Sequence, residues 1–368
     1  MGLLPGIARG VHVSIPVAGH VISAYAVGVV VGAPLIAVLG ARLPRRGLLL
    51  TLMAWFAAAN AASALAPGYA SLTVFRFLTG IPHGAFFGVA SLVAASLVAP
   101  ARRGRAVSLV MLGIPVANIA GVPAATWMGQ QLGWRSVYWA VAALGLLTVA
   151  LVAAAVPAIA TDGAATGRRE LRAFASVQVW LTLLVGAIGF GGMFAMYSYI
   201  APTVTHVTGL SRDAVPLFLL AFGVGGTLGT YVAGRMADWS VLRSLVIGSA
   251  GMGGALALFT LTAHLAVPGV LTVLLIAALA SVLVVNLQLR LMHVAGEAQT
   301  LGAAMNHASL NAANALGAWL GGLVIAAGWG YTAPSWVGAG LSLAGLLVLA
   351  VSVLLHRRDL RDRLSAPA

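Results

Sequence analysis

The chain is built largely from apolar runs, each about as long as a helix that crosses a lipid bilayer. Such a helix needs about 20 predominantly apolar residues. Runs of that length lie near 16–39, 47–66, 70–98, 106–129, 136–156, 176–200, 214–234, 244–263, 268–289, 301–327 and 334–355. They are continuous, whereas the strands of a membrane barrel alternate over about 10 residues. The sequence therefore predicts an all-α polytopic membrane protein with eleven complete spans.

Charge is too scarce for a soluble protein. Only 7% of the 368 residues are charged and 61% are hydrophobic, whereas a soluble domain carries roughly 25% charged residues. This composition excludes a soluble enzyme fold and a disordered chain. Cysteine is absent, which excludes disulfides, thiolate metal sites and cysteine nucleophiles.

Catalysis and ATP use are also disfavoured by the residues that are missing. The sequence has no lysine, so it cannot contain the Gly-Lys-Ser/Thr ending of a phosphate-binding P-loop. It shows no pair of carboxylates, metal-ligand set or nucleophile with its base inside an apolar run, as an intramembrane enzyme would need. We therefore expect no enzyme activity, no cofactor and no metal, and a lipid bilayer as the chain's surroundings.

The arginines predict how the chain lies in the membrane. The net charge of +13 does not indicate nucleic-acid binding, because the arginines occupy short breaks between apolar runs rather than one face of a soluble fold. One alternate set of breaks, with the C-terminal tail, holds Arg42, Arg45, Arg46, Arg102, Arg103, Arg105, Arg168, Arg169, Arg172, Arg235, Arg243, Arg290, Arg357, Arg358, Arg361 and Arg363. The other set holds Arg9, Arg135 and Arg212. The positive-inside rule puts the richer set and the C-terminus in the cytoplasm of a bacterial inner membrane.

The chain repeats itself at an offset of about 197 residues. Ala24-Tyr-Ala-Val-Gly28 followed by Gly32 resembles Ala221-Phe-Gly-Val-Gly225 followed by Gly229, and Gly133-Trp134 resembles Gly328-Trp329. We interpret this as a tandem duplication, as transporters often show. It predicts an N-terminal half over 1–156, a cytoplasmic linker over 157–175, a C-terminal half over 176–355 and a solvated tail over 356–368.

The repeat also carries an expectation about the first helix. Moved back by 197 residues, the run at 176–200 lies mostly before Met1, so Met1–Ile7 is expected to form only its outer end. The architecture would then be six plus six helices with most of the first helix missing. We expect a start codon assigned too late, with a truncated product as the alternative.

Several motifs resemble one family of membrane proteins. The segment Arg76-Phe-Leu-Thr-Gly80-Ile-Pro-His83-Gly84-Ala-Phe-Phe-Gly88 resembles the fourth-helix motif of the drug/proton antiporters of the major facilitator superfamily. The segments MGLLP, Pro82-His83-Gly84, Gly121-Val-Pro123 and Tyr199-Ile-Ala-Pro202 resemble its arabinose-efflux and chloramphenicol-resistance exporter branch. The resemblance implies twelve helices and an acidic residue in the first helix, upstream of Met1.

The loop motif of that family is kept only in part. Arg42, Arg45 and Arg46 occupy its basic positions in the first half, where its glycine and aspartate are lost. The second half keeps Gly234 and Asp238 but has Trp239 in place of the first arginine. A detailed transfer of the family's gating mechanism is therefore not warranted.

Two residues within the third run are candidates for proton coupling. Arg76 lies about six residues, or roughly 9 Å, into its run, and an arginine near the bilayer centre costs about 2.5–3.5 kcal/mol on insertion scales. His83 follows seven residues later on the same helix face, and an unperturbed histidine titrates near neutral pH. The alternatives are an arginine that extends to the interface and a neutral histidine bonded between helices.

Other residues are candidates for the substrate cavity or for helix packing. The cavity candidates are Phe86, Phe87, Phe190, Phe194, Tyr197, Tyr199, Asn306 and His307, with ordinary core packing as the alternative. The candidates for packing or gating are Gly80, Gly84, Asn118, Gly121, Pro123, Gly234, Asp238, Asn314 and Gly317, because small residues let helices approach closely and asparagine bonds across the contact.

The residues and the resemblance together lead to one expectation about function. We expect a monomeric secondary transporter that exports a small organic solute, a drug or a sugar, in exchange for protons by alternating access. The alternative is a remnant that inserts into the membrane but moves no solute. Uptake of the solute in place of export is a further alternative.

Overall fold

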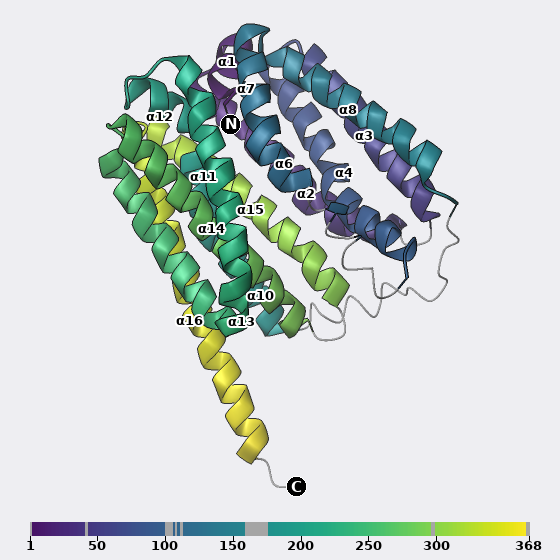
Figure 1. Ribbon diagram of the computed structural model, residues 1–368. Helices are drawn as coiled ribbons and strands as arrows, with labels where there is room; N and C mark the ends of the chain where they lie inside the picture. The colour runs from purple at the N-terminus through teal and green to yellow at the C-terminus, as the bar shows by residue number, and fades with distance from the viewer. Residues whose placement is uncertain are drawn as a thin grey trace.

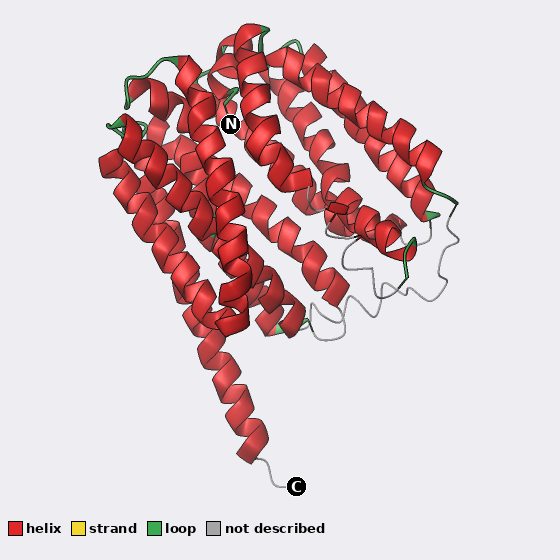
Figure 2. Cartoon of the chain, in the orientation of Figure 1, coloured by secondary structure: helices red, strands yellow, loops and turns green. Residues whose placement is uncertain are grey.

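The computed structural model describes residues 2–40, 43–99, 106, 109–110, 113–158, 176–295 and 299–365. Every regular element in these ranges is helical (Figure 2), so the predicted all-α class is confirmed. Nine helices of the described residues are long and apolar enough to cross a membrane. In a bilayer a helix is favoured because it satisfies its own backbone hydrogen bonds.

The described helices follow the predicted runs closely. In the first half they are α1 (Leu4–Gly10), α2 (Ile15–Gly40), α3 (Arg45–Leu65), α4 (Tyr69–Ser96), α6 (Gly113–Val116), the π-helix η2 (Ala117–Gly121), α7 (Val122–Gln131) and α8 (Trp134–Ala155). In the second half they are α10 (Val177–Leu184), the π-helix η4 (Val185–Gly189), α11 (Gly191–Ser198), α12 (Ile200–His206), the short 3₁₀ turn η5 (Arg212–Ala214), α13 (Val215–Thr262), α14 (Ala266–Val294), α15 (Gln299–Ala326) and α16 (Ala333–Ser365).

Two predicted runs lie under the one label α13, which comprises two helices joined at a sharp kink. The runs at 214–234 and 244–263 both lie in α13, and Ser240, with φ −173° and ψ 115°, marks the kink between them. The run at 106–129 lies partly outside the described residues, and so do residues 159–175 of the predicted linker. The tail expected at 356–368 continues α16 as a helix to Ser365, which projects beyond the bundle in Figure 1.

The closest helix contacts occur twice, at equivalent positions. A Cβ atom added to Gly28 of α2 would lie 2.1 Å from the carbonyl oxygen of Phe77 in α4, and one added to Gly225 of α13 would lie 2.2 Å from that of Leu274 in α14. Phe77 and Leu274 are themselves 197 residues apart. The same helix pair is therefore packed in the same register in both halves, which supports the proposed duplication.

The turns repeat as well. Left-handed backbone occurs at His12 (φ 56°) and Gly209 (φ 72°), and again at Gly133 (φ 84°) and Gly328 (φ 83°). Glycine adopts this conformation without steric cost, whereas histidine does so less readily. The short helix α1, with Pro5, therefore corresponds to α12, with Pro202.

The two halves meet along α2 and α15, and where α13 packs against α7 and η2. A Cβ atom added to Gly223 of α13 would lie 2.6 Å from the carbonyl oxygen of Asn118 in η2. Helices α1 and α12 lie near one end of the bundle, together with the turns at Gly133 and Gly328 (Figure 1). We call this the N-terminal end, and the end with the chain's last residues the C-terminal end.

We predict that Gly28→Ala destabilises the protein, because the added methyl group would collide with the backbone of α4. Overpacking of this kind costs about 1–3 kcal/mol. The thermal unfolding midpoint of the detergent-solubilised protein should fall clearly.

The matched control is Gly254→Ala, where an added Cβ atom meets nothing within 4 Å. It should leave the midpoint unchanged or raise it slightly, because alanine favours a helix more than glycine does. Equal midpoints for the two variants would contradict the close α2–α4 contact.

Candidate functional site

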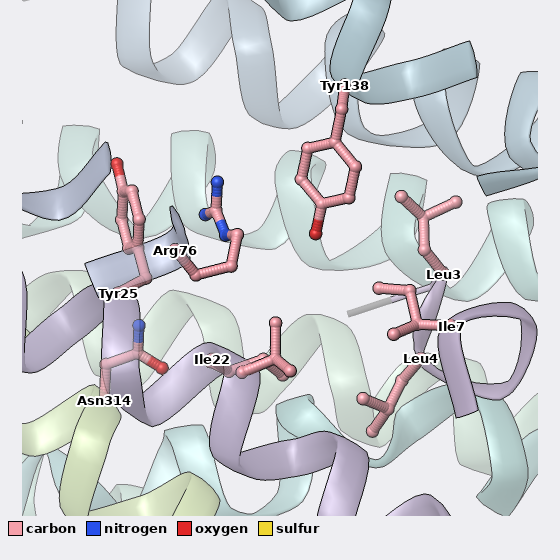
Figure 3. Close-up of a pocket in the computed structure, with 9 residues that line it drawn as sticks. Leu3, Leu4, Ile7, Ile22, Tyr25, Arg76, Tyr138 and Asn314 are labelled. Carbon is pink, nitrogen blue, oxygen red and sulfur yellow. The ribbon is translucent and has the colours of Figure 1, made fainter. Parts of the chain in front are cut away.

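A cavity of about 270 Å³ lies between the first-half helices and α15. Figure 3 shows that one part of its wall is polar and the opposite part apolar. Its lining residues are Leu3, Leu4, Ile7, Val21, Ile22, Tyr25, Arg76, Tyr138 and Asn314. Arg76 and Asn314 are the sequence candidates among them, and the site therefore lies mainly within the first half.

Arg76 is held by aromatic rings and one amide. Its guanidinium carbon lies 4.3 Å from the ring centroid of Tyr25 and 5.2 Å from that of Tyr138, both within the range of a cation–π interaction. Its Nη1 donates a hydrogen bond of 3.3 Å to Oδ1 of Asn60 in α3. Asn60 is only 2% exposed and is anchored by its own bond to the carbonyl oxygen of Phe56.

No carboxylate neutralises this cation among the residues whose side chains the structure describes. Asp213 and Asp238, the two acids in that set, are exposed and stand at helix ends or turns. A charge inside a membrane protein is costly unless water or polar groups surround it. Arg76 therefore depends on the cavity, the two tyrosine rings and Asn60.

Tyr25 connects Arg76 to His83. Its hydroxyl group lies 2.6 Å from Nδ1 of His83, at hydrogen-bond distance. The ring of His83 also packs against Phe87, at 5.3 Å between centroids, and against Phe56 at 6.4 Å. The two predicted proton-coupling residues thus belong to one continuous network, with Tyr25 as the link.

A ring contact connects this network to the second half. The ring of Phe87 stacks on His307 of α15, with centroids 6.0 Å apart and planes inclined by 13°. Phe86 turns instead to a small apolar cluster with Leu48 and Leu52. Beside His307, Asn306 is 1% exposed, and neither atom of its amide finds a hydrogen-bond partner in the described part of the chain.

The other aromatic candidates are core residues in this structure. Phe190 packs edge-on against Phe194 at 5.5 Å, and Tyr197 stacks on Phe222 at 4.1 Å. All four belong to the apolar core of the second half. Tyr199 is fully buried between the two halves. Whether any of them contacts a solute stays a prediction.

The glycine candidates fall into two groups. Gly80 faces α2, where an added Cβ atom would lie 2.1 Å from the carbonyl oxygen of Tyr25. Gly84 also faces α2, and Gly317 faces α11, where the corresponding distance to the carbonyl oxygen of Gly191 is 2.3 Å. A Cβ atom added to Gly121 would make an ordinary van der Waals contact, and one added to Gly234 would meet nothing within 4 Å.

The remaining packing candidates occupy the ends or the interior of helices. Pro123 is the second residue of α7, and Asn118 lies in η2, directly opposite Gly223. Oδ1 of Asn314 is buried beside the cavity without a hydrogen-bond partner in the described residues. Arg42 lies outside the described residues, Arg45 begins α3, and Arg46 donates to the carbonyl oxygen of Ala153 in α8.

Comparison with known proteins decides the family. Residues 1–306 match the Major Facilitator Superfamily. The chain belongs to this superfamily. It is 41% identical to the inner membrane transport protein YdhP of Escherichia coli over 95% of this chain and 90% of that protein. It is 34% identical to a chloramphenicol resistance protein of Streptomyces lividans (94% and 90%) and 32% identical to the putative transporter AraJ of Escherichia coli (99% and 91%).

Membership of the superfamily confirms the resemblance seen in the motifs and identifies a transporter of small molecules rather than an enzyme. In the duplicated scaffold of this chain, however, the members of the network all belong to the first half. They are Tyr25, Asn60, Arg76 and His83. At the offset of 197 residues fixed by the glycine contacts, four polar residues correspond to apolar ones: Tyr25 to Phe222, Asn60 to Ala257, Arg76 to Val273 and His83 to Ala280.

Sequence reasoning missed Tyr25, Asn60 and Tyr138. The repeat in the sequence could have pointed to Tyr25, because Tyr25 and the apolar Phe222 occupy the same place in the two copies of the repeated segment. Asn60 and Tyr138 lie on other helices from Arg76, at separations of 16 and 62 residues, and only the fold brings them to the same cavity.

We predict that Arg76→Met abolishes transport without unfolding the protein. Methionine fills a similar volume, and removing a partly buried cation that pairs with no carboxylate in the described residues relieves a desolvation cost without leaving an opposite charge unpaired. The loss of the bond to Asn60 offsets part of that gain. The thermal midpoint should stay within a few degrees of the parent or rise, while transport is lost.

Arg135→Met is the control, because Arg135 stacks on Trp134 and bonds to the carbonyl oxygen of Ala66 outside the cavity lining. It should keep transport. A fall of more than 10 °C for Arg76→Met would show that Arg76 is mainly structural.

Proposed function

We propose that this chain is a multi-pass transporter of the bacterial inner membrane that exports a small organic solute in exchange for protons. The C-terminal end of the bundle faces the cytoplasm, as the arginine distribution favours, and the monomer is the working unit. The relatives' names support export of foreign or metabolic compounds, since one of them is a chloramphenicol resistance protein and another is a probable sugar efflux transporter.

One observation carries the proposal: the network Asn60–Arg76–Tyr25–His83 lies in one half only. The equivalent helix contact in the second half forms without polar groups at these four positions, as their apolar counterparts show. The helix contact therefore does not need a cation and a titratable ring at these positions beside the cavity, and their presence there points to function. The pair joins a fixed charge at the cavity to an imidazole, which is a group that can gain or lose a proton.

The arrangement explains how binding of the solute would disfavour binding of the proton, and the reverse. The charge on Arg76 is permanent, so a second positive charge on His83 needs water or polar groups to screen it. Water in the cavity supplies that screening, and a solute that fills the cavity displaces it. Solute and proton thus disfavour each other's binding, which is the coupling that exchange requires.

Alternating access would expose the solute-bound and the proton-bound forms of the site to opposite sides of the membrane. The halves pack against each other along α2 and α15, and rocking one half against the other would expose the cavity to each side in turn. Phe87 and His307 lie at this interface, so the ring contact between them would change during the movement.

An export assay tests the proposal. Expression in a bacterial host that lacks its major efflux pumps should lower the intracellular level of at least one compound from a panel of amphenicols and sugars. A protonophore should abolish the effect. Absence of export across the whole panel, for a protein shown to be folded in the membrane, would favour the transport-inactive remnant.

We predict that His83→Asn uncouples the transporter. Asparagine can still accept a hydrogen bond from Tyr25 but does not titrate near neutral pH. Export driven by a pH gradient in inverted vesicles should fall at least tenfold, while expression and thermal stability are retained.

His264→Asn is the matched control, because His264 lies in the turn between α13 and α14, away from the network. It should export like the parent. Full export by the His83→Asn protein would remove His83 from the coupling mechanism.

A further inference from the structure

Tyr199 belongs to the second half by sequence, but it lies at the boundary of the halves and clusters with apolar residues of the first. It is 0% exposed, and it forms one apolar cluster with Leu4, Ile7, Ala18 and Trp134. The other large aromatic residues near it in the sequence, such as Tyr197, lie in the core of the second half. Tyr199 therefore projects from one half of the transporter into the other at the N-terminal end.

The ring occupies a socket that only glycine can line. Its hydroxyl group donates a hydrogen bond of 2.7 Å to the carbonyl oxygen of Ala318, which fixes it on α15 of its own half. On the opposite side lies Gly19 of α2, where an added Cβ atom would stand 2.2 Å from that hydroxyl oxygen. Gly322 of α15 completes the socket, at a corresponding distance of 2.6 Å.

Tyr199 also stands at a break in the backbone. Helix α11 ends at Ser198 and α12 begins at Ile200, and Tyr199 between them has φ −112° and ψ 18°. Pro202, in the first turn of α12, has no backbone N–H, so it cannot continue the backbone hydrogen bonds of α11. The segment that carries the ring can therefore change direction without unfolding either helix.

We propose that Tyr199 holds the N-terminal end of the transporter closed. While the ring lies against Gly19, α2 and α15 cannot separate at this end, and opening requires the ring to leave the first-half core. Two hydrogen bonds between the halves, from Ser23 to the carbonyl oxygen of Ala315 and from Gln130 to that of Arg212, support the same closed contact. The proposal requires neither a particular solute nor proton coupling.

The absence of cysteine from the chain makes a distance measurement direct. Leu132 and Trp329 lie at the N-terminal end in different halves and are 71% and 70% exposed. Spin labels on Leu132→Cys and Trp329→Cys report the separation of the halves by pulsed electron resonance, in the otherwise unchanged full chain reconstituted in nanodiscs. The parent should give one dominant short distance.

Gly19→Ala should add a population with a longer distance, because the new methyl group collides with the hydroxyl oxygen of Tyr199. Tyr199→Phe removes that oxygen and should by itself leave the short distance dominant. In the double variant the longer population should shrink by at least half, since the atom that collides is gone. Gly340→Ala, where an added Cβ atom meets nothing within 4 Å, should match the parent.

Two results would overturn the proposal: Gly19→Ala gives the parent's distances, or its longer population persists undiminished in the double variant. If Gly19→Ala does not fold, Tyr199→Ala takes its place, because it removes the ring that bridges the halves. It should also populate the longer distance, and parent-like distances for it would contradict the proposal.

Discussion

The backbone contact between α2 and α4 is the constraint on which the rest of the structure depends. At Gly28 and Gly80 each helix approaches the carbonyl oxygens of the other so closely that a single added carbon would not fit. Membrane helices gain little from apolar burial against one another, so close packing of small residues is what holds them together. The same contact brings Tyr25 of α2 beside Arg76 and His83 of α4, and thereby builds the functional network.

The duplicated scaffold separates what folding needs from what transport needs. Gly225 and Gly229 reproduce the close contact in the second half, where Phe222 and Ala280 stand in place of Tyr25 and His83. The first half thus carries a partly buried cation and a titratable ring beside the cavity, whereas the second half has apolar residues at the equivalent positions. The buried arginine of the second half, Arg290, stands at another position and bonds to Gln178. Because a charge in the membrane is expensive, its retention beside a cavity is best explained by the proposed coupling of solute to protons.

Much of the fold could be predicted from the sequence, because the length and continuity of apolar runs follow directly from the thickness of a bilayer. The helical tail up to Ser365 could not, since a polar, charged end of a chain is compatible with either a loop or a helix. Of the site, Arg76 and His83 stood out as polar groups inside apolar runs. Tyr25, Asn60 and Tyr138 did not, because their role depends on which helix faces meet. Tyr199 was visible as an aromatic residue but not as a contact between the halves.

The most direct test of the proposed coupling is the number of protons released when the purified protein binds its solute. Calorimetric titration in two buffers with different ionisation enthalpies measures this number without any transport step. The account predicts that wild-type protein releases a fraction of a proton per solute bound in the pH range where His83 titrates, and that the His83→Asn protein releases none in that range. Identical binding enthalpies in both buffers for the wild-type protein, or proton uptake instead of release, would contradict the account.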